Sequence, residues 1–141
     1  FKVFQNDGRL SLSDQLGETY KENYLGDSFN EVKYKKIKNR PLISSVVVAV
    51  CMKRDATKKI PEIEEIEAVA CAVQNMMLTA TAYGIGSFWS TPKLLDKPEM
   101  KDFFHLEEDD KCLGLLYFGY TNETWPSGQR KPIEYVTEWI N

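Results

Sequence analysis

Two long apolar runs define the hydrophobic pattern of the chain. Residues 43–52 are rich in β-branched side chains and do not alternate with polar ones, which predicts a strand buried on both faces. Residues 111–120 form the second run and predict another buried strand. Residues 1–5 alternate between apolar and polar positions, as a short strand does, and an Asn-Asp-Gly turn follows at positions 6–8.

Segments with helical features separate these strands. Residues 11–14 resemble a capping box, so a helix is expected over residues 11–24. A second short helix is expected over residues 30–38, because Pro41 opposes its continuation, and a third over residues 97–104. The alternation of strands and helices predicts a layered α/β or α+β fold.

The longest periodic segment is a helix that begins at Pro61 and ends at Gly84 and Gly86. Four glutamates lie in or near its first turn, where the helix dipole favours negative charge. From Ala68 to Ala82 its side chains are apolar nearly all round. Such a helix lies either in the centre of a core or in a subunit interface.

Composition and charge limit the possible classes of function. The 141 residues predict a single domain spanning 1–141, and 43% apolar with 28% charged residues is ordinary for a soluble domain. The net charge of −3 argues against nucleic acid as the main partner, because phosphate neutralisation requires a basic face. Since no window of 18 residues is apolar and free of charge, we expect no transmembrane helix and no membrane partner. We also expect a cytoplasmic protein, because the three cysteines are interpreted as buried cytosolic thiols.

One basic run departs from this balance, and it comprises Lys33, Lys35, Lys36, Lys38 and Arg40. It can be the solvated face of a short helix, which is the commoner case. It can also be an electropositive rim that attracts an anionic cofactor or substrate.

The three cysteines and the single histidine are interpreted as structural. Cys51, Cys71 and Cys112 lie in apolar runs, and their spacing fits neither a zinc site nor a disulfide framework, so buried thiols are expected. His105 lies between two apolar residues and is expected to be structural. Neither a metal ligand nor a catalytic acid or base is assigned.

Two segments carry candidate chemistry. Residues 84–92 lead from the long helix through a glycine-punctuated turn into a short aromatic strand, where backbone amides and the hydroxyls of Ser90 and Thr91 suit a flat ligand. Residues 125–132 form a loop that presents Arg130 and Lys131, and arginine suits bidentate contact with phosphate. Each segment also has a plain structural interpretation, as a helix end followed by a strand and as a solvated charged loop.

The C-terminal segment is too apolar for a free terminus, so it is expected to dock on another surface. Its large apolar side chains are Trp125, Tyr135, Val136, Trp139 and Ile140.

The order of these segments resembles the flavin-dependent nitroreductase family. Residues 67–80 and 83–89 resemble the central helix and the following strand of that family, and residues 113–120 resemble its next core strand. Residues 129–139 resemble its C-terminal Lys/Arg-Pro-Leu-Glu-Glu-Val-Val signature. Phe1 fits the position just after the Gln-Pro-Trp segment of the family, so the resemblance covers essentially the whole chain.

The resemblance implies an α+β fold with a mixed sheet between helices, and a homodimer in which the C-terminal tail embraces the partner. It implies FMN in two clefts at the interface, NAD(P)H as hydride donor, and a nitroaromatic, quinone or similar small molecule as acceptor. Carried over by position, Trp89, Ser90 and Thr91 would line one side of the flavin, with the Thr91 amide donating to flavin N5. Arg130, with Lys131 as helper, would contact the FMN phosphate.

Two positions depart from the family pattern. Pro92 stands where relatives often have glycine, and Gly128 stands where a lysine often precedes the arginine. The chain also begins without Met and in mid-element, so we expect an N-terminally truncated domain. Because the N-terminal phosphate-binding segment of the family would then be missing, we expect this polypeptide alone to bind FMN weakly.

Two other functions stay open. A dehalogenase or flavin-destroying relative would share the fold and differ in the lid over the substrate, for which residues 20–38 are the candidate. A non-catalytic flavin-fold module, completed by another chain or not at all, is the alternative from another class.

Overall fold

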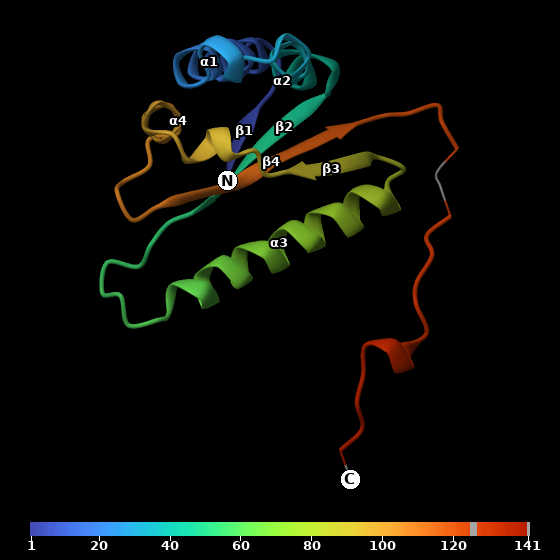
Figure 1. The fold of residues 1–141 in the computed structure, drawn as a ribbon. Helices are drawn as coiled ribbons and strands as arrows, with labels where there is room; N and C mark the ends of the chain where they lie inside the picture. Colours follow the sequence, from blue (N-terminus) through green and yellow to red (C-terminus); the bar gives the residue numbers. More distant parts are fainter. Residues whose placement is uncertain (125–126, 141) are drawn as a thin grey trace.

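Four strands form one sheet at the centre of the protein (Figure 1). The computed structural model describes residues 1–124 and 127–140. The spatial order is β1-β2-β4-β3 and each neighbouring pair is antiparallel, so the sheet expected to be mixed is antiparallel throughout the described residues. The strands are β1 (Lys2–Phe4), β2 (Val46–Met52), β3 (Gly86–Ser90) and β4 (Lys111–Gly119).

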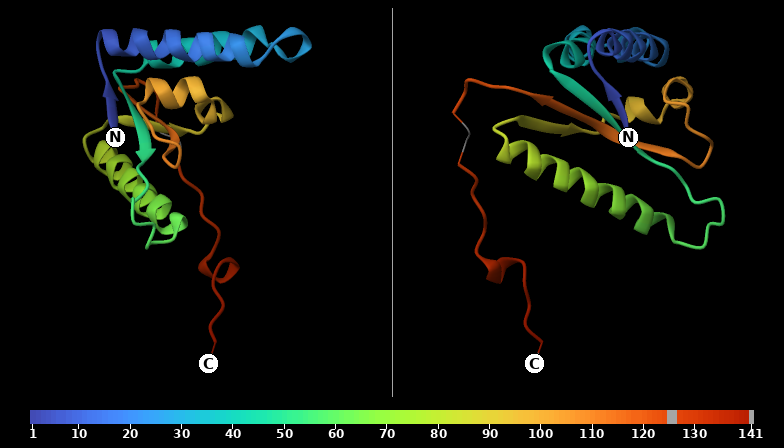
Figure 2. Two further views of the ribbon diagram at one scale, coloured as in Figure 1. Left: turned by 90° about the vertical axis from the view of Figure 1, so that its left-hand side faces the viewer. Right: turned by 180° about the vertical axis from the view of Figure 1, so that it is seen from behind.

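Helices cover both faces of this sheet, which confirms the predicted α+β fold. On one face lie α1 (Asp7–Asn23), α2 (Glu31–Ile43) and α4 (Pro98–Phe103). Of the described helices, α3 (Glu62–Ala82) is the one that lies on the opposite face (Figures 1 and 2). Short 3-10 turns occur at Gly26–Ser28, Lys93–Asp96 and Ile133–Tyr135.

Each face of the sheet has its own hydrophobic cluster. Val47 and Ala49 of β2 belong to the cluster under α1, while Val48 and Val50 belong to the cluster under α3. This alternation confirms that β2 is buried on both faces. The cluster under α1 is much the larger, and it also contains Leu12, Leu16, Tyr20, Leu94, Leu95, Met100, Phe104, Cys112, Leu115 and Tyr117.

The boundaries of α3 agree with the prediction, but the helix is covered on one side only. Pro61 is its N-cap residue, and Gly84, with φ of 69°, lies just past its end. Of its residues, only Val73 and Ala80 are buried. For residues 68–82 the central-core alternative is therefore wrong, since the described part of the chain leaves the outer face of α3 in solvent.

The first helix begins earlier than predicted. It starts at Asp7 rather than Ser11, because the turn expected at positions 6–8 is already the first turn of the helix. The Gly8 N–H donates to the Gln5 carbonyl (2.9 Å), and Asp7 provides a negative charge at the positive end of the helix dipole.

The second helix continues past the proline that was expected to end it. It runs through Pro41 to Ile43, whereas its end was expected at Lys38. Pro41 is buried and lies in the last turn, where the missing N–H removes only one intrahelical hydrogen bond. The Ser44 hydroxyl donates to the Arg40 carbonyl (2.8 Å), which satisfies one acceptor at this end of the helix.

The C-terminal segment runs away from the sheet after β4 (Figures 1 and 2). Trp125, which belongs to the predicted docking segment, lies outside the described residues. The described large apolar side chains of the segment are all exposed, so its docking surface is not provided by the described part of the same chain. They are Ile133, Tyr135, Val136, Trp139 and Ile140.

Candidate functional site

The predicted flavin-facing residues lie at the end of β3, an edge strand of the described sheet. Trp89 and Ser90 pair with β4, and Thr91 follows directly. Because side chains alternate along a strand, Trp89 packs on the α3 side while Phe88 and Ser90 face the end of α2. The fold therefore brings a hydroxyl and an aromatic ring to one surface.

A glycine of the neighbouring strand permits the position of Trp89. Gly114 has φ of 144°, and a Cβ atom there would lie 2.3 Å from Trp89 Nε1 and 2.7 Å from the Ser90 carbonyl oxygen. Only a residue without a side chain allows the indole and the end of β3 to approach β4 so closely. The buried Trp89 Nε1 has no hydrogen-bond partner among the described residues.

Arg40, in the last turn of α2, reaches the end of β3. Its Nη1 donates to the Ser90 hydroxyl (3.3 Å), and its guanidinium carbon lies 5.1 Å from the centroid of the Phe88 ring. Sequence analysis identified Arg40 only as part of a basic run. It could not predict the contact with Ser90, because the two residues are 50 positions apart and only the folded sheet brings them together.

Arg40 and Phe88 border a cavity of about 330 Å³. The Phe88 and Tyr117 rings stack with their centroids 6.4 Å apart, and Phe88 is 52% exposed. The cavity therefore offers an aromatic and aliphatic surface with a cation at its edge, which suits a flat ligand that carries polar or negative groups. Its lining consists of Arg40, Ile43, Ser44, Phe88 and Tyr117.

Tyr117 provides a test of this environment. Burial raises the pKa of Tyr117 to about 12, although the Arg40 charge opposes the shift. The folded state thus favours the neutral phenol of Tyr117. The stabilisation that this neutral phenol contributes is complete below pH 10 and is lost as the pH rises to about 12. We expect Tyr117→Phe to reduce the loss of unfolding free energy over this range, measured by urea unfolding at each pH. The exposed Tyr83→Phe is the control, and identical profiles for Tyr117→Phe and the parent would refute the expectation.

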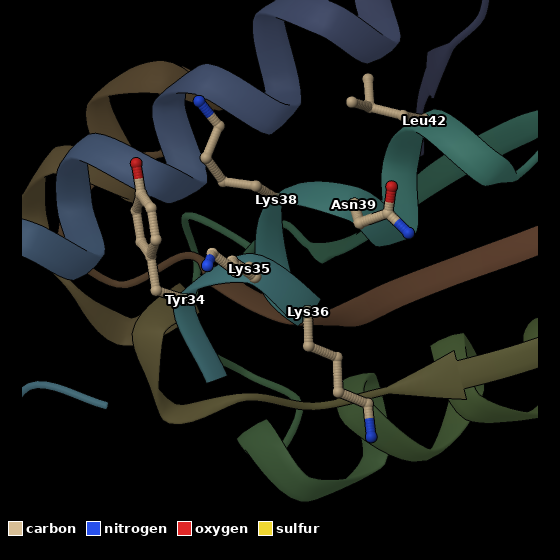
Figure 3. Close-up of a pocket in the computed structure, with 6 residues that line it drawn as sticks. All are labelled: Tyr34, Lys35, Lys36, Lys38, Asn39 and Leu42. Atoms are coloured by element: carbon tan, nitrogen blue, oxygen red, sulfur yellow. The ribbon is translucent and has the colours of Figure 1, made fainter. Parts of the chain in front are cut away.

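A larger cavity, of about 460 Å³, lies beside the basic run of α2 (Figure 3). Lys35 Nζ is paired with Glu31 Oε1 at 3.1 Å, and Lys38 Nζ with Asp14 Oδ1 at 3.0 Å. Because these two lysines already have acidic partners, the structure favours the solvated helix face over the electropositive rim for Lys35 and Lys38, whereas Arg40 of the same run lines the smaller cavity. The lining residues are Tyr34, Lys35, Lys36, Lys38, Asn39 and Leu42.

The predicted phosphate-binding residues lie elsewhere. Arg130 and Lys131 are exposed on the C-terminal segment, and Lys131 Nζ lies 5.9 Å from the Tyr135 ring centroid. Among the described residues, no hydrogen bond or ion pair connects either cation to β3. A single copy of the chain therefore brings Trp89, Ser90 and Thr91 together, whereas the C-terminal segment, which carries Arg130 and Lys131, runs away from the sheet (Figure 1).

The remaining candidate groups differ in exposure. Cys112 is buried and Cys51 half-buried, but Cys71 is exposed, so the expectation of a buried thiol is wrong for Cys71 because α3 is covered on one side only. His105 is exposed and has φ of 49° just after α4. Within residues 1–124 and 127–140, no three His, Cys, Asp or Glu side chains converge as a metal site would require.

Part of the candidate lid is structural. Tyr20, at the start of residues 20–38, is 1% exposed and stacks on Tyr24 with ring centroids 4.6 Å apart. It therefore belongs to the core under α1.

No helix in the described part of the chain has the length and apolarity that crossing a membrane would require.

A profile of the nitroreductase family matches residues 7–120, which is most of the chain and includes all of β2, α3, β3 and β4. The chain belongs to the nitroreductase family. The match ends at Tyr120, so the proposed roles of Arg130 and Lys131 rest on the resemblance of the C-terminal segment alone.

The similarity to an individual relative agrees with this family assignment. YdjA of Escherichia coli (strain K12), provisionally named an NAD(P)H nitroreductase, is 28% identical over 119 residues, which cover 84% of this chain and 63% of YdjA. This nitroreductase-family chain thus spans less than two thirds of the length of that relative.

Solved structures show the same fold. The crystal structure of a nitroreductase-like family protein from Bacillus cereus superposes with a TM-score of 0.80 at 24% identity, covering 99% of this chain and 71% of that one. The FMN-dependent nitroreductase NfnB from Mycobacterium smegmatis, solved in complex with NADPH, gives a TM-score of 0.70 at 15% identity, covering 99% and 78%. At these identities the likeness concerns the fold.

Proposed function

We propose that this chain is part of a cytoplasmic FMN-dependent NAD(P)H oxidoreductase that reduces nitroaromatics, quinones or similar small molecules. Family membership and the names of the relatives support this proposal. The observation that carries it is the end of β3, where Arg40 donates to the Ser90 hydroxyl and, together with Phe88 and Tyr117, lines the 330 Å³ cavity. When bound, FMN supplies the exchange of a hydride with NAD(P)H and the delivery of electrons to the acceptor.

The described residues fit one side of a flavin. A flavin has a flat ring with polar edges and carries a phosphate, so it needs an apolar surface, hydrogen-bond donors and positive charge. The surface comes from the aromatic end of β3, and Arg40 orients the Ser90 hydroxyl beside it. The backbone N–H of Thr91 would donate to flavin N5, whereas the following Pro92 has no N–H to offer. Arg130, with Lys131 beside it, is the proposed partner of the phosphate.

The site also requires a second copy of the chain. We place the homodimer interface on the outer face of α3 and on the C-terminal segment, because both expose apolar side chains that the described chain leaves uncovered. An obligate interface of this kind buries more than about 2,000 Å². The assembly would bring the C-terminal segment, and with it Arg130, onto folded surface.

Replacing Arg130 by alanine tests its proposed role. Loss of a charge-assisted hydrogen bond costs about 1.5–3 kcal/mol, so FMN affinity is expected to fall roughly 10- to 150-fold in a fluorescence titration. Riboflavin has no phosphate and should bind Arg130→Ala and the parent almost equally, while Arg130→Lys should retain part of the FMN affinity. Equal losses for FMN and riboflavin would show damaged folding and contradict a phosphate contact.

An absorbance spectrum separates the enzyme from the non-catalytic module. The purified protein is expected to shift the absorbance bands of oxidised flavin when it is titrated with excess FMN, and the bound flavin should lose its yellow colour when NADH or NADPH is added without oxygen. A flavin spectrum that the protein leaves unchanged, or bound flavin that neither nucleotide reduces, would favour the module. The dehalogenase alternative has no support from the geometry of the described lid segment.

A further inference from the structure

Two thiols face each other across the central strands of the sheet. Cys51 of β2 is the register partner of Cys112 of β4, next to a bulge in which β4 carries the extra residue Leu113. Cys112 belongs to the hydrophobic cluster under α1, and Cys51 packs against the same cluster, so both side chains are on one face. The fold thus pairs two of the three cysteines, although they are 61 positions apart in the sequence.

The spacing of such a pair is close to that of a disulfide. Directly opposite residues of an antiparallel pair have Cβ atoms about 4.5–5.5 Å apart. A disulfide requires about 3.5–4.5 Å, so a small shift at the bulge is sufficient. In the reduced chain each thiol donates to a main-chain carbonyl two residues away along its own strand, Cys51 to Ala49 (3.8 Å) and Cys112 to Gly114 (3.7 Å).

The two thiols have unequal environments. Cys51 is half-buried, and its pKa is lowered, mainly because the Cys112 thiol can donate to the Cys51 thiolate and further because of the Lys2 charge. Cys112 is only 8% exposed, and its pKa is raised by the Cys51 sulfur and by burial. Cys51 is therefore the sulfur that an oxidant in solution meets first, and Cys112 is the buried neighbour that can respond.

We propose that Cys51 and Cys112 form an oxidative modification site, at which hydrogen peroxide converts the two thiols into a disulfide that joins β2 to β4. The Cys51 sulfur attacks one peroxide oxygen, the O–O bond breaks, the leaving hydroxide takes up the thiol proton as water, and Cys51 becomes a sulfenic acid. The Cys112 sulfur then attacks the Cys51 sulfur, the S–O bond breaks, and the hydroxyl leaves with the Cys112 proton as a second water. Two thiols are oxidised and one peroxide is reduced to two waters.

Mass spectrometry of the full chain in a Cys71→Ser background tests this pairing, because that variant removes the exposed third thiol. After treatment with hydrogen peroxide and alkylation in denaturant, the expected product has lost two hydrogen atoms, has no alkylated thiol, and yields a peptide pair linking residues 51 and 112. Reduction with dithiothreitol should restore both thiols.

Two single variants separate the roles of the thiols. In Cys112→Ala the reaction should stop at a sulfenic acid on Cys51, which dimedone traps, and in Cys51→Ala the Cys112 thiol should stay unmodified. The proposal is overturned if Cys51 accumulates as sulfinic acid beside an alkylated Cys112, or if both thiols survive peroxide in the folded chain but not in denaturant. The measurement on the Cys71→Ser chain decides the pairing even if a core variant fails to fold.

Discussion

Replacing Gly114 by alanine is expected to lower the unfolding free energy by about 2–6 kcal/mol. The added Cβ would lie 2.3 Å from Trp89 Nε1 and 2.7 Å from the Ser90 carbonyl oxygen, distances at which atoms overlap. Overpacking of this kind costs about 1–3 kcal/mol, and a φ of 144° adds backbone strain of about 1–3 kcal/mol for a residue with a side chain. Urea unfolding at one fixed protein concentration measures the loss.

Gly84→Ala is the matched control for the clash. Gly84 also has positive φ, 69°, but a Cβ added there would have no heavy atom within 4 Å beyond its chain neighbours, so strain acts without overlap. The expected loss is about 1–2 kcal/mol. If Gly114→Ala lowers the unfolding free energy no more than Gly84→Ala does, β3 does not approach β4 as closely as the structure shows. Gly114→Ala should also weaken flavin binding, since the clash displaces Trp89 and the end of β3.

Replacing Leu78 by aspartate is expected to dissociate the proposed homodimer. Leu78 lies on α3 and is 59% exposed in the single chain. Burying an unpaired carboxylate in an apolar interface costs several kcal/mol, so the dimer dissociation constant should rise by roughly a hundredfold or more. Sedimentation velocity across a concentration series measures this change.

Val32→Asp is the control for the charge itself. Val32 is 77% exposed on α2, on the opposite face of the sheet from α3, so its replacement should leave the association unchanged. A dimer that tolerates Leu78→Asp as well as Val32→Asp would place the interface elsewhere than on α3.

Local sequence patterns were sufficient for the elements whose own residues form a regular apolar pattern. The continuous apolar run of β2 and the periodic stripe of α3 predicted both elements within a few residues, because each pattern has only one regular solution. Pro41 shows where a local rule failed. Its position in the last turn of a helix packed on α1 lets the helix continue, and the sequence alone does not show that packing.

The candidate site was predicted only in part, for a physical reason. Trp89, Ser90 and Thr91 are consecutive, so a strand end alone predicts that they lie together. Arg40 reaches Ser90 only because the sheet order places β3 near the end of α2, and the glycine at 114 matters only because Trp89 lies against it. The exposure of Cys71 was likewise not predictable, since it depends on what covers α3.

Sedimentation with detection at a flavin absorbance wavelength tests the proposed function most directly. FMN is proposed to bind where two copies of this nitroreductase-family chain meet, so in saturating FMN the bound flavin should sediment with the dimer at about one FMN per chain. Leu78→Asp should then lose bound flavin in proportion to the dimer lost. Flavin that sediments with a folded monomer, at full affinity and without dependence on protein concentration, would contradict this placement of the site.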